Sequence, residues 1–134
     1  MFDLVGNDNT MRLLEATMDI SSARHSVITS NIANVDTPGY KAMDMDFAKE
    51  LRVALRLSEK GDTAPGSSGT FSYDLTLKPR LFEVSDVTPR QDGNTVDMDK
   101  EMGKMAQTIS TYTRAASIYA IKLRMLKAAV SGGN

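Results

Sequence analysis

Ten residues recur with alternating steps of four and three along the last part of the chain, and we call them the seam. They are Met98, Met102, Met105, Ile109, Tyr112, Ala116, Tyr119, Leu123, Leu126 and Val130. This spacing keeps one helical face against a partner, as in a coiled coil. Asp97 can cap the first turn, and Gly132-Gly133 can end the helix. A helix of about 33 residues is roughly 50 Å long. The seam therefore predicts a long helix that needs a lengthwise partner.

A second heptad repeat near the N-terminus supplies that partner. It comprises Met11, Leu14, Met18, Ser21, His25, Ile28, Ile32 and Val35. An adjacent stripe repeats with the same steps through Leu13, Ala16, Ile20, Ala23 and Val27. Two stripes on one helix, expected from about residue 9 to 34, imply more than one packing partner. The predicted fold is mainly α, with the two long terminal helices packed as an antiparallel coiled coil.

Between the two repeats, Pro38-Gly39 marks a change of direction. Proline disfavours helical backbone at the residue before it, so the first helix should stop by Asp36. Pro and Gly also suit the two central positions of a type II turn. We therefore divide the chain into a coiled-coil helix over 1–36, a middle segment over 37–96 and a second coiled-coil helix over 97–134.

The middle segment shows weaker signals. Phe47, Leu51, Ala54 and Leu55 have helical spacing, which predicts a short helix near 44–59. The Gly- and Ser-rich composition after Lys60 indicates a flexible loop. Partial alternation over 71–90, interrupted by two prolines, predicts short strands or extended edges. The sequence Asp92-Gly93-Asn94 predicts a turn before the last helix.

Composition excludes several kinds of function. The chain has no cysteine, one histidine and a formal net charge of -1. We expect no catalytic set, metal or cofactor, and no basic surface for nucleic acid. His25 lies on the N-terminal repeat, where a packing or subunit-contact role is favoured. No apolar run is long enough to span a bilayer, and the first residues do not have the pattern of a cleaved secretory signal.

The segment around Pro38 resembles the N-terminal signature of bacterial flagellar rod and hook proteins. The matching residues are Asn31, Ala33, Asn34, Asp36, Thr37, Pro38, Gly39, Tyr40 and Lys41. The block over 92–102 and the closing residues 122–130 are similar to those of the short proximal rod proteins of the FlgB type. The short middle segment also fits, since distal rod and hook members carry larger inserted domains.

This resemblance implies a structural subunit of the flagellar basal-body rod rather than an enzyme. It implies type III export without a cleaved signal and assembly in the periplasm, where the seam would contact other subunits. The implied partners are other rod subunits, the rod-base adapter, the membrane ring and the export gate, with no nucleic acid and no small-molecule substrate. Two alternatives remain open, the other short proximal rod protein and a cytoplasmic coiled-coil adaptor or chaperone.

The resemblance also implies a short export element with a Phe-x-x-x-apolar pattern. Phe47 and Leu51 have this spacing and lie outside both heptad repeats. Residues four apart are also neighbours on any helix, so the same pair can simply pack on a short amphipathic helix. The spacing therefore allows both an export role and a packing role.

Overall fold

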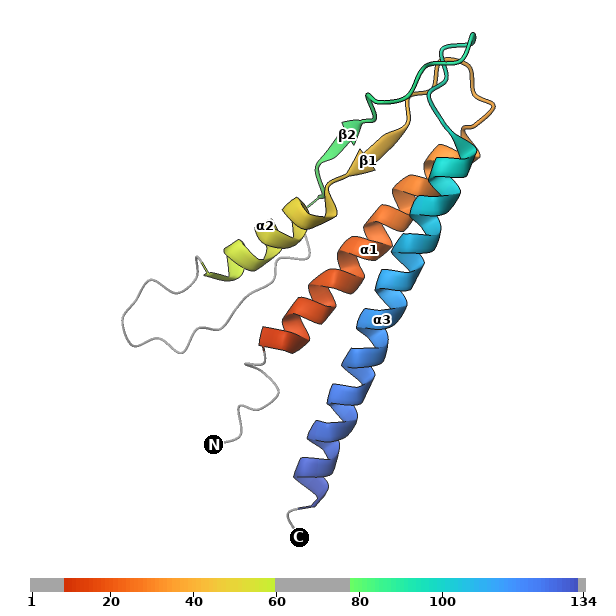
Figure 1. The fold of residues 1–134 in the computed structure, drawn as a ribbon. Coiled ribbons are helices and arrows are strands. Elements are labelled where there is room, and N and C mark those ends of the chain that lie inside the picture. Colours follow the sequence, from red (N-terminus) through yellow and green to blue (C-terminus); the bar gives the residue numbers. More distant parts are fainter. Residues whose placement is uncertain (1–8, 60–77, 133–134) are drawn as a thin grey trace.

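The computed structural model describes residues 9–59 and 78–132, which form an elongated, mainly helical unit (Figure 1). In chain order the elements are α1 (Asn9–Ala33), β1 (Met43–Met45), α2 (Phe47–Glu59), β2 (Leu81–Glu83) and α3 (Met98–Ser131). Figure 1 shows α1 and α3 lying side by side, with α2 and the two strands beside α1. The predicted pair of long helices that pack together is confirmed. The expected loop over 60–70 and the alternation over 71–77 lie outside the described residues.

Helix ends follow the local chemistry of the sequence. The Asp97 carboxylate accepts the N–H groups of Asp99 and Lys100, so it caps α3 as predicted. At the other end, Gly132 donates its N–H to the carbonyl of Ala128. The first helix ends at Ala33, before the turn that contains Pro38. Both long helices therefore begin and end close to where the sequence places them.

The two apolar stripes of α1 meet different neighbours. Ala16 and Ile20, from the second stripe, form a buried cluster with Met45 of β1 and Ala54 of α2. In the first stripe, Met11, Leu14, Ser21 and Ile28 are buried, and Ser21 faces α3. The expectation that α1 needs more than one packing partner is confirmed within a single chain.

Strands β1 and β2 form a two-stranded antiparallel sheet, in which Asp44 pairs with Phe82. This pairing corrects the predicted helix near 44–59, whose first residues are extended. The helix begins at Phe47 because the Asp46 carboxylate accepts the N–H of Lys49 at 3.0 Å and caps it there. Leu81 and Phe82 of β2 are exposed.

The face that α3 buries differs from the seam. Its buried residues are Glu101, Thr108 and Ala115, one every seven positions. By helical periodicity this stripe lies roughly 60° around the helix from the seam. Thr108 and Ala115 are short and Glu101 is hydrogen-bonded, so α1 can approach this stripe closely. The centre of the face that α3 presents to α1 is therefore this stripe, and the seam lies to one side of it.

Candidate assembly surface

The turn after α1 has the geometry that Pro38-Gly39 predicts. Gly39 has a φ of 73°, in the left-handed region, and Tyr40 donates its N–H to the carbonyl of Thr37 at 3.2 Å. A hydrogen bond across four residues with positive φ at the third is the pattern of a type II turn. The turn leads the chain from the end of α1 into β1.

A fully buried side chain, Asn94, holds this turn from the other side. Its Nδ2 donates to the carbonyls of Asn34, Val35 and Thr37 at 3.0, 3.1 and 2.8 Å. Its Oδ1 accepts the N–H of Val96 at 2.7 Å. These three carbonyls lie beyond the end of α1, and three donations from one buried side chain fix the path of the turn.

Asn31, the first residue of the motif, joins three elements. Its side-chain amide makes two hydrogen bonds with the Met43 backbone. Nδ2 donates to the Met43 carbonyl at 2.7 Å, and Oδ1 accepts the Met43 N–H at 3.0 Å. The same Nδ2 donates to Oε2 of Glu101 at 2.9 Å. A single amide therefore pairs with one edge of β1 as a neighbouring strand would, and ties α1 to α3.

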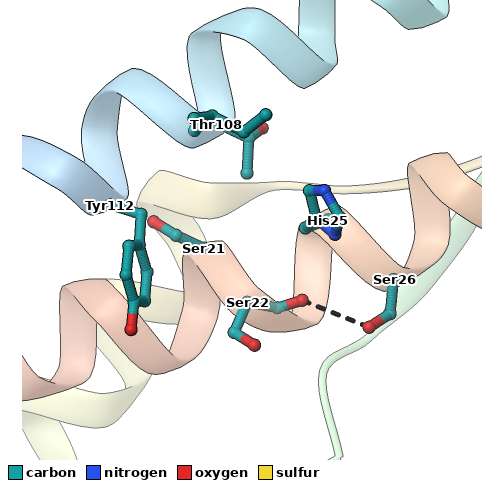
Figure 2. Close-up of a pocket in the computed structure, with 7 residues that line it drawn as sticks. Ser21, Ser22, His25, Ser26, Thr108 and Tyr112 are labelled. Atoms are coloured by element: carbon teal, nitrogen blue, oxygen red, sulfur yellow. Dashed lines mark hydrogen bonds between the residues drawn. The ribbon is translucent and has the colours of Figure 1, made fainter.

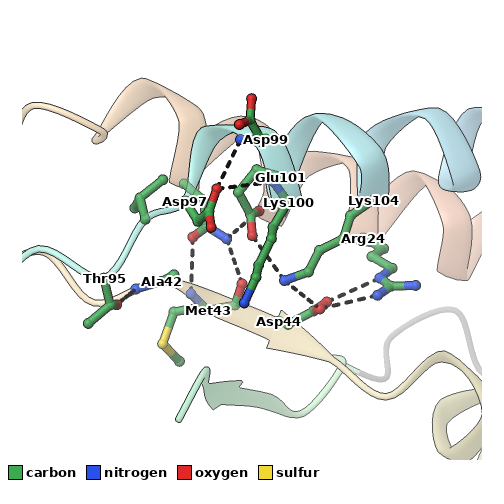
Figure 3. A network of polar contacts seen from close by, with 12 residues as sticks. Arg24, Ala42, Met43, Asp44, Thr95, Asp97, Asp99, Lys100, Glu101 and Lys104 are labelled. Atoms are coloured by element: carbon green, nitrogen blue, oxygen red, sulfur yellow. Dashed lines mark hydrogen bonds and ion pairs between the residues drawn. The ribbon is translucent and has the colours of Figure 1, made fainter. Parts of the chain in front are cut away.

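Four charged side chains extend these contacts (Figure 3). We call them, together with Asn31 and Asn94, the joint. Arg24 donates to both carboxylate oxygens of Asp44 at 3.1 Å. Lys104 lies 3.1 Å from the same carboxylate and donates to Glu101 at 2.9 Å. Two positive and two negative groups thus balance, as partly or fully buried charges require.

The pKa values of the two central groups follow from this arrangement. Burial alone would raise the pKa of Asp44, but hydrogen bonds from Arg24, the Met45 N–H and Lys104 outweigh it and lower the pKa. Burial would lower the pKa of Lys104, but hydrogen bonds to Glu101 and Asp44 raise it. Both groups therefore stay charged across the neutral range.

The seam lies at the surface of the described chain. Six of its members are exposed: Met98, Met102, Ile109, Tyr112, Leu123 and Val130. The other four, Met105, Ala116, Tyr119 and Leu126, are half-buried. Tyr119 also donates to Glu15 of α1 at 2.8 Å, and this hydrogen bond raises the pKa of the phenol. The six exposed side chains are spread from the first to the last turns of α3 and form an apolar surface of the kind that marks a protein–protein contact.

Phe47 and Leu51 lie on α2 and are half-buried. Both pack against the buried cluster that contains Ile20 and Met45. The structure thus gives the pair a packing role in the folded subunit, while a role in export stays a prediction.

His25 is exposed and lines a pocket between α1 and α3. Across residues 9–59 and 78–132 there is no group of three or more His, Cys, Asp or Glu placed to hold a metal ion. Within the same ranges, no helix has the length and apolar character of a membrane span.

Sequence reasoning missed the polar residues that build the joint. Asp44 and Glu101 belong to neither heptad repeat, so periodicity does not single them out. Asn94 was assigned to a turn without a partner. Glu101 lies three residues before Lys104, a spacing that is also common for solvent-exposed ion pairs on helices, so it gives no signal of burial.

Comparison with known proteins gives the family. A sequence model described as Flagella basal body rod protein matches residues 11–41, which contain most of α1 and the turn. The flagellar basal body rod protein FlgB of Salmonella typhimurium is 32% identical over 139 residues, covering 95% of this chain and 96% of the relative. FlgB of Escherichia coli is 30% identical over 133 residues, with 95% and 96% covered. FlgB of Cereibacter sphaeroides is 34% identical over 118 residues, covering 84% and 87%. With this coverage from end to end, the chain belongs to the FlgB family of flagellar basal body rod proteins.

Proposed function

We propose that the chain is a structural subunit of the proximal rod of the flagellar basal body, and that it polymerises through its terminal helices. The observation that carries this function is the exposed seam of α3 in a member of a rod protein family. Apolar faces of this length favour burial, at about 25 cal/mol for each Å² removed from water. Packed against neighbouring subunits, the seam would help to form part of the drive shaft for motility.

In this proposal the helices over 1–36 and 97–134 are the assembling arms, and residues 37–96 form the middle of the subunit. The arms act as an antiparallel coiled coil only in the rod, where helices of neighbouring subunits complete the heptads of the seam. The exposure of Leu123 and Val130 supports this, because their heptad positions lack a covering helix within the described chain.

The motif from Asn31 to Lys41 has a different role in this proposal. Its contacts are within the subunit, through Asn94, Met43 and Glu101. We therefore assign it to setting the angle at which the middle segment leaves the helix pair. The partners proposed for the assembled subunit are other rod subunits, the rod-base adapter and the membrane ring.

Export precedes assembly in this proposal. The chain would leave the cytoplasm unfolded through the flagellar type III export gate, without a cleaved signal peptide, and enter the periplasmic rod. Phe47 and Leu51 would be displayed during export and buried against the α1 cluster after folding. Their half-buried packing is compatible with use at both stages.

The function is tested by complementation. A strain that lacks its own proximal rod gene of this type should regain basal bodies and swimming when it expresses the chain. Tagged protein should then co-purify with basal bodies from the periplasmic and membrane fraction. Recovery of the protein only from the cytoplasm, with no basal bodies formed, would contradict a rod function.

A further inference from the structure

A pocket of about 250 Å³ opens between α1 and α3, near the middle of α1 (Figure 2). Its α1 side carries Ser21, Ser22 and His25, and its α3 side carries Thr108 and Tyr112. Figure 2 shows Thr108 of α3 facing Ser21 and His25 of α1. Ile109 and Tyr112, which line the pocket, are exposed members of the seam, so the pocket and the seam form one continuous surface.

The chemistry of this pocket favours an apolar occupant. The Ser21 hydroxyl donates to the Thr17 carbonyl at 2.7 Å, and the Thr108 hydroxyl donates to the Lys104 carbonyl at 2.8 Å. Ser26, which also lines the pocket, donates to the Ser22 carbonyl. These three hydroxyl groups already donate within their own helices. The other polar groups of the lining belong to Ser22, His25 and Tyr112, which are exposed and can stay in contact with water. The volume is also below the roughly 300–1,000 Å³ of small-molecule sites. A large side chain is the better match.

The origin of the pocket lies in the N-terminal heptad repeat. Leu14 and Ile28 are large and buried, but Ser21 between them is small, and the next position is His25, which is exposed. Helix pairs normally fill such positions, because protein interiors pack closely and leave few voids. The sequence therefore determines where along the two helices the pocket lies. It has the form of a site for a side chain from a third helix.

A matching surface is present on the same chain. Ile118, Ile121 and Met125 are 50%, 46% and 67% exposed on α3, and we call them the second flank. By helical periodicity the second flank lies roughly 110° from the buried stripe, on the side opposite the seam. The seam of α3 thus adjoins the pocket, and the second flank presents exposed apolar side chains on the other side of the helix.

We propose that the second flank of one copy seats a side chain in the pocket of the next copy. This rests on the proposed function as a polymerising rod subunit and specifies which surfaces meet. Because the two surfaces differ, each copy keeps a free pocket and a free flank after one contact forms. A contact between unlike surfaces repeats from copy to copy instead of closing as a two-fold dimer. That property suits a growing tubular assembly.

Paired cysteines test the contact directly, since the chain has none of its own. The double variant Ser22→Cys, Ile121→Cys is expressed in the complemented strain and oxidised after assembly. Ile121 lies nine residues beyond Tyr112, roughly 14 Å along α3, so a bond within one copy exceeds the limit of about 7 Å between Cα atoms. We expect a ladder of trimers and larger species on non-reducing gels. Each single-cysteine variant should give no species larger than a dimer.

Filling the pocket supplies a second measurement. Ser22→Leu adds apolar bulk at an exposed position, so the monomer should keep its stability but lose motility. The matched control is Ser117→Leu, which adds the same bulk to an exposed site on α3 outside the pocket. Normal swimming by Ser22→Leu, or a double-cysteine strain that swims yet forms no ladder, would overturn the contact while leaving the rod function intact. Failure of the wild-type chain to restore basal bodies would instead overturn the proposed function.

Discussion

Asn31 of α1 donates to Glu101 of α3 at 2.9 Å, although 70 positions separate them in the chain. Both side chains are buried. The same Asn31 amide bonds to the Met43 backbone, and Glu101 also accepts from Lys104. The two long helices and the middle segment are therefore joined at one place, next to the turn.

Replacing Asn31 should weaken the whole fold. Asn31→Ala removes both bonds to Met43 and leaves the Glu101 carboxylate with fewer donors, which should cost about 3 kcal/mol in the free energy of unfolding. Asn31→Asp should be at least as damaging, because it keeps the shape but places a second carboxylate beside Glu101. Urea unfolding followed by circular dichroism measures both. The exposed Thr29→Ala on the same helix is the control and should change stability by no more than about 0.5 kcal/mol. Equal stability of Asn31→Ala and the control would exclude this role.

Gly39 should tolerate asparagine better than valine. A Cβ at this position would meet nothing within 4 Å, so any penalty comes from the φ of 73° and not from a clash. Left-handed backbone costs L-residues roughly 1–2 kcal/mol, more for β-branched side chains and less for Asn. We expect Gly39→Val to lower the urea midpoint and to impair rod assembly, with Gly39→Asn in between. If valine and wild type unfold at the same urea concentration, the turn assignment is wrong.

The charged joint should give stability a defined pH window. Asp44 has a folded pKa below its ordinary 3.8, so its contribution is present above that value and is lost as pH falls through the lower folded pKa. Lys104 has a folded pKa above 10.5, so its contribution is present below that value and is lost as pH rises through the higher one. Unfolding measured from pH 2 to 11 should show a plateau between these limits.

The Asp44→Asn variant isolates the acid side of this window. It should be less stable than wild type at neutral pH. The difference between the two proteins should shrink as pH falls from about 4, where Asp44 of the unfolded chain becomes protonated, through the lower pKa of the folded protein. A difference that stays constant down to pH 2 would show that the charge of Asp44 does not stabilise the joint.

A charged substitution distinguishes a role of the seam in assembly from a role in folding. Leu123 is exposed, so Leu123→Asp should change monomer stability by no more than about 0.5 kcal/mol. In the rod the same carboxylate would be buried without a partner, and assembly should fail. The measurement is swimming together with the yield of basal bodies. Ser117→Asp, exposed on the same helix but outside the seam, should assemble. Normal motility with Leu123→Asp would remove this position from the assembly contact.

Phe47 can be tested for export apart from packing. Phe47→Ala should lower the amount of subunit that reaches the periplasm while its cytoplasmic level stays unchanged. Phe47→Leu keeps an apolar side chain for the cluster around Ile20 but lacks the aromatic ring, so it separates the two roles. Secretion is measured before assembly, in a strain blocked at rod formation. Unchanged secretion of both variants would assign Phe47 to packing alone.

Local signals explain what could be predicted from the sequence. The heptad repeats, the Asp97 cap and the Pro38-Gly39 turn each depend on residues a few positions apart, so the sequence alone predicts all three. It does not predict the face of α3 that meets α1. The seam is the most apolar stripe, yet the buried stripe contains Glu101 and Thr108, and Glu101 can be buried there because Asn31 and Lys104 bond to it. Likewise, Asn94 bonds to carbonyls 57 to 60 positions away. The periodicity of a sequence gives no information on hydrogen-bond partners that lie this far apart in the chain.

In mechanical terms, the helix pair is a beam clamped at one end. The clamp is the joint of Asn31, Asp44, Asn94 and Glu101, and towards the opposite end α1 and α3 share the exposed bond between Glu15 and Tyr119. A beam of this kind deflects little at its clamp and most at its tip. When a rotating shaft twists the subunit, the load passes into the clamp. The end of the subunit beside the turn is therefore held by buried polar groups, whereas its grip on neighbours is set by the apolar faces further along.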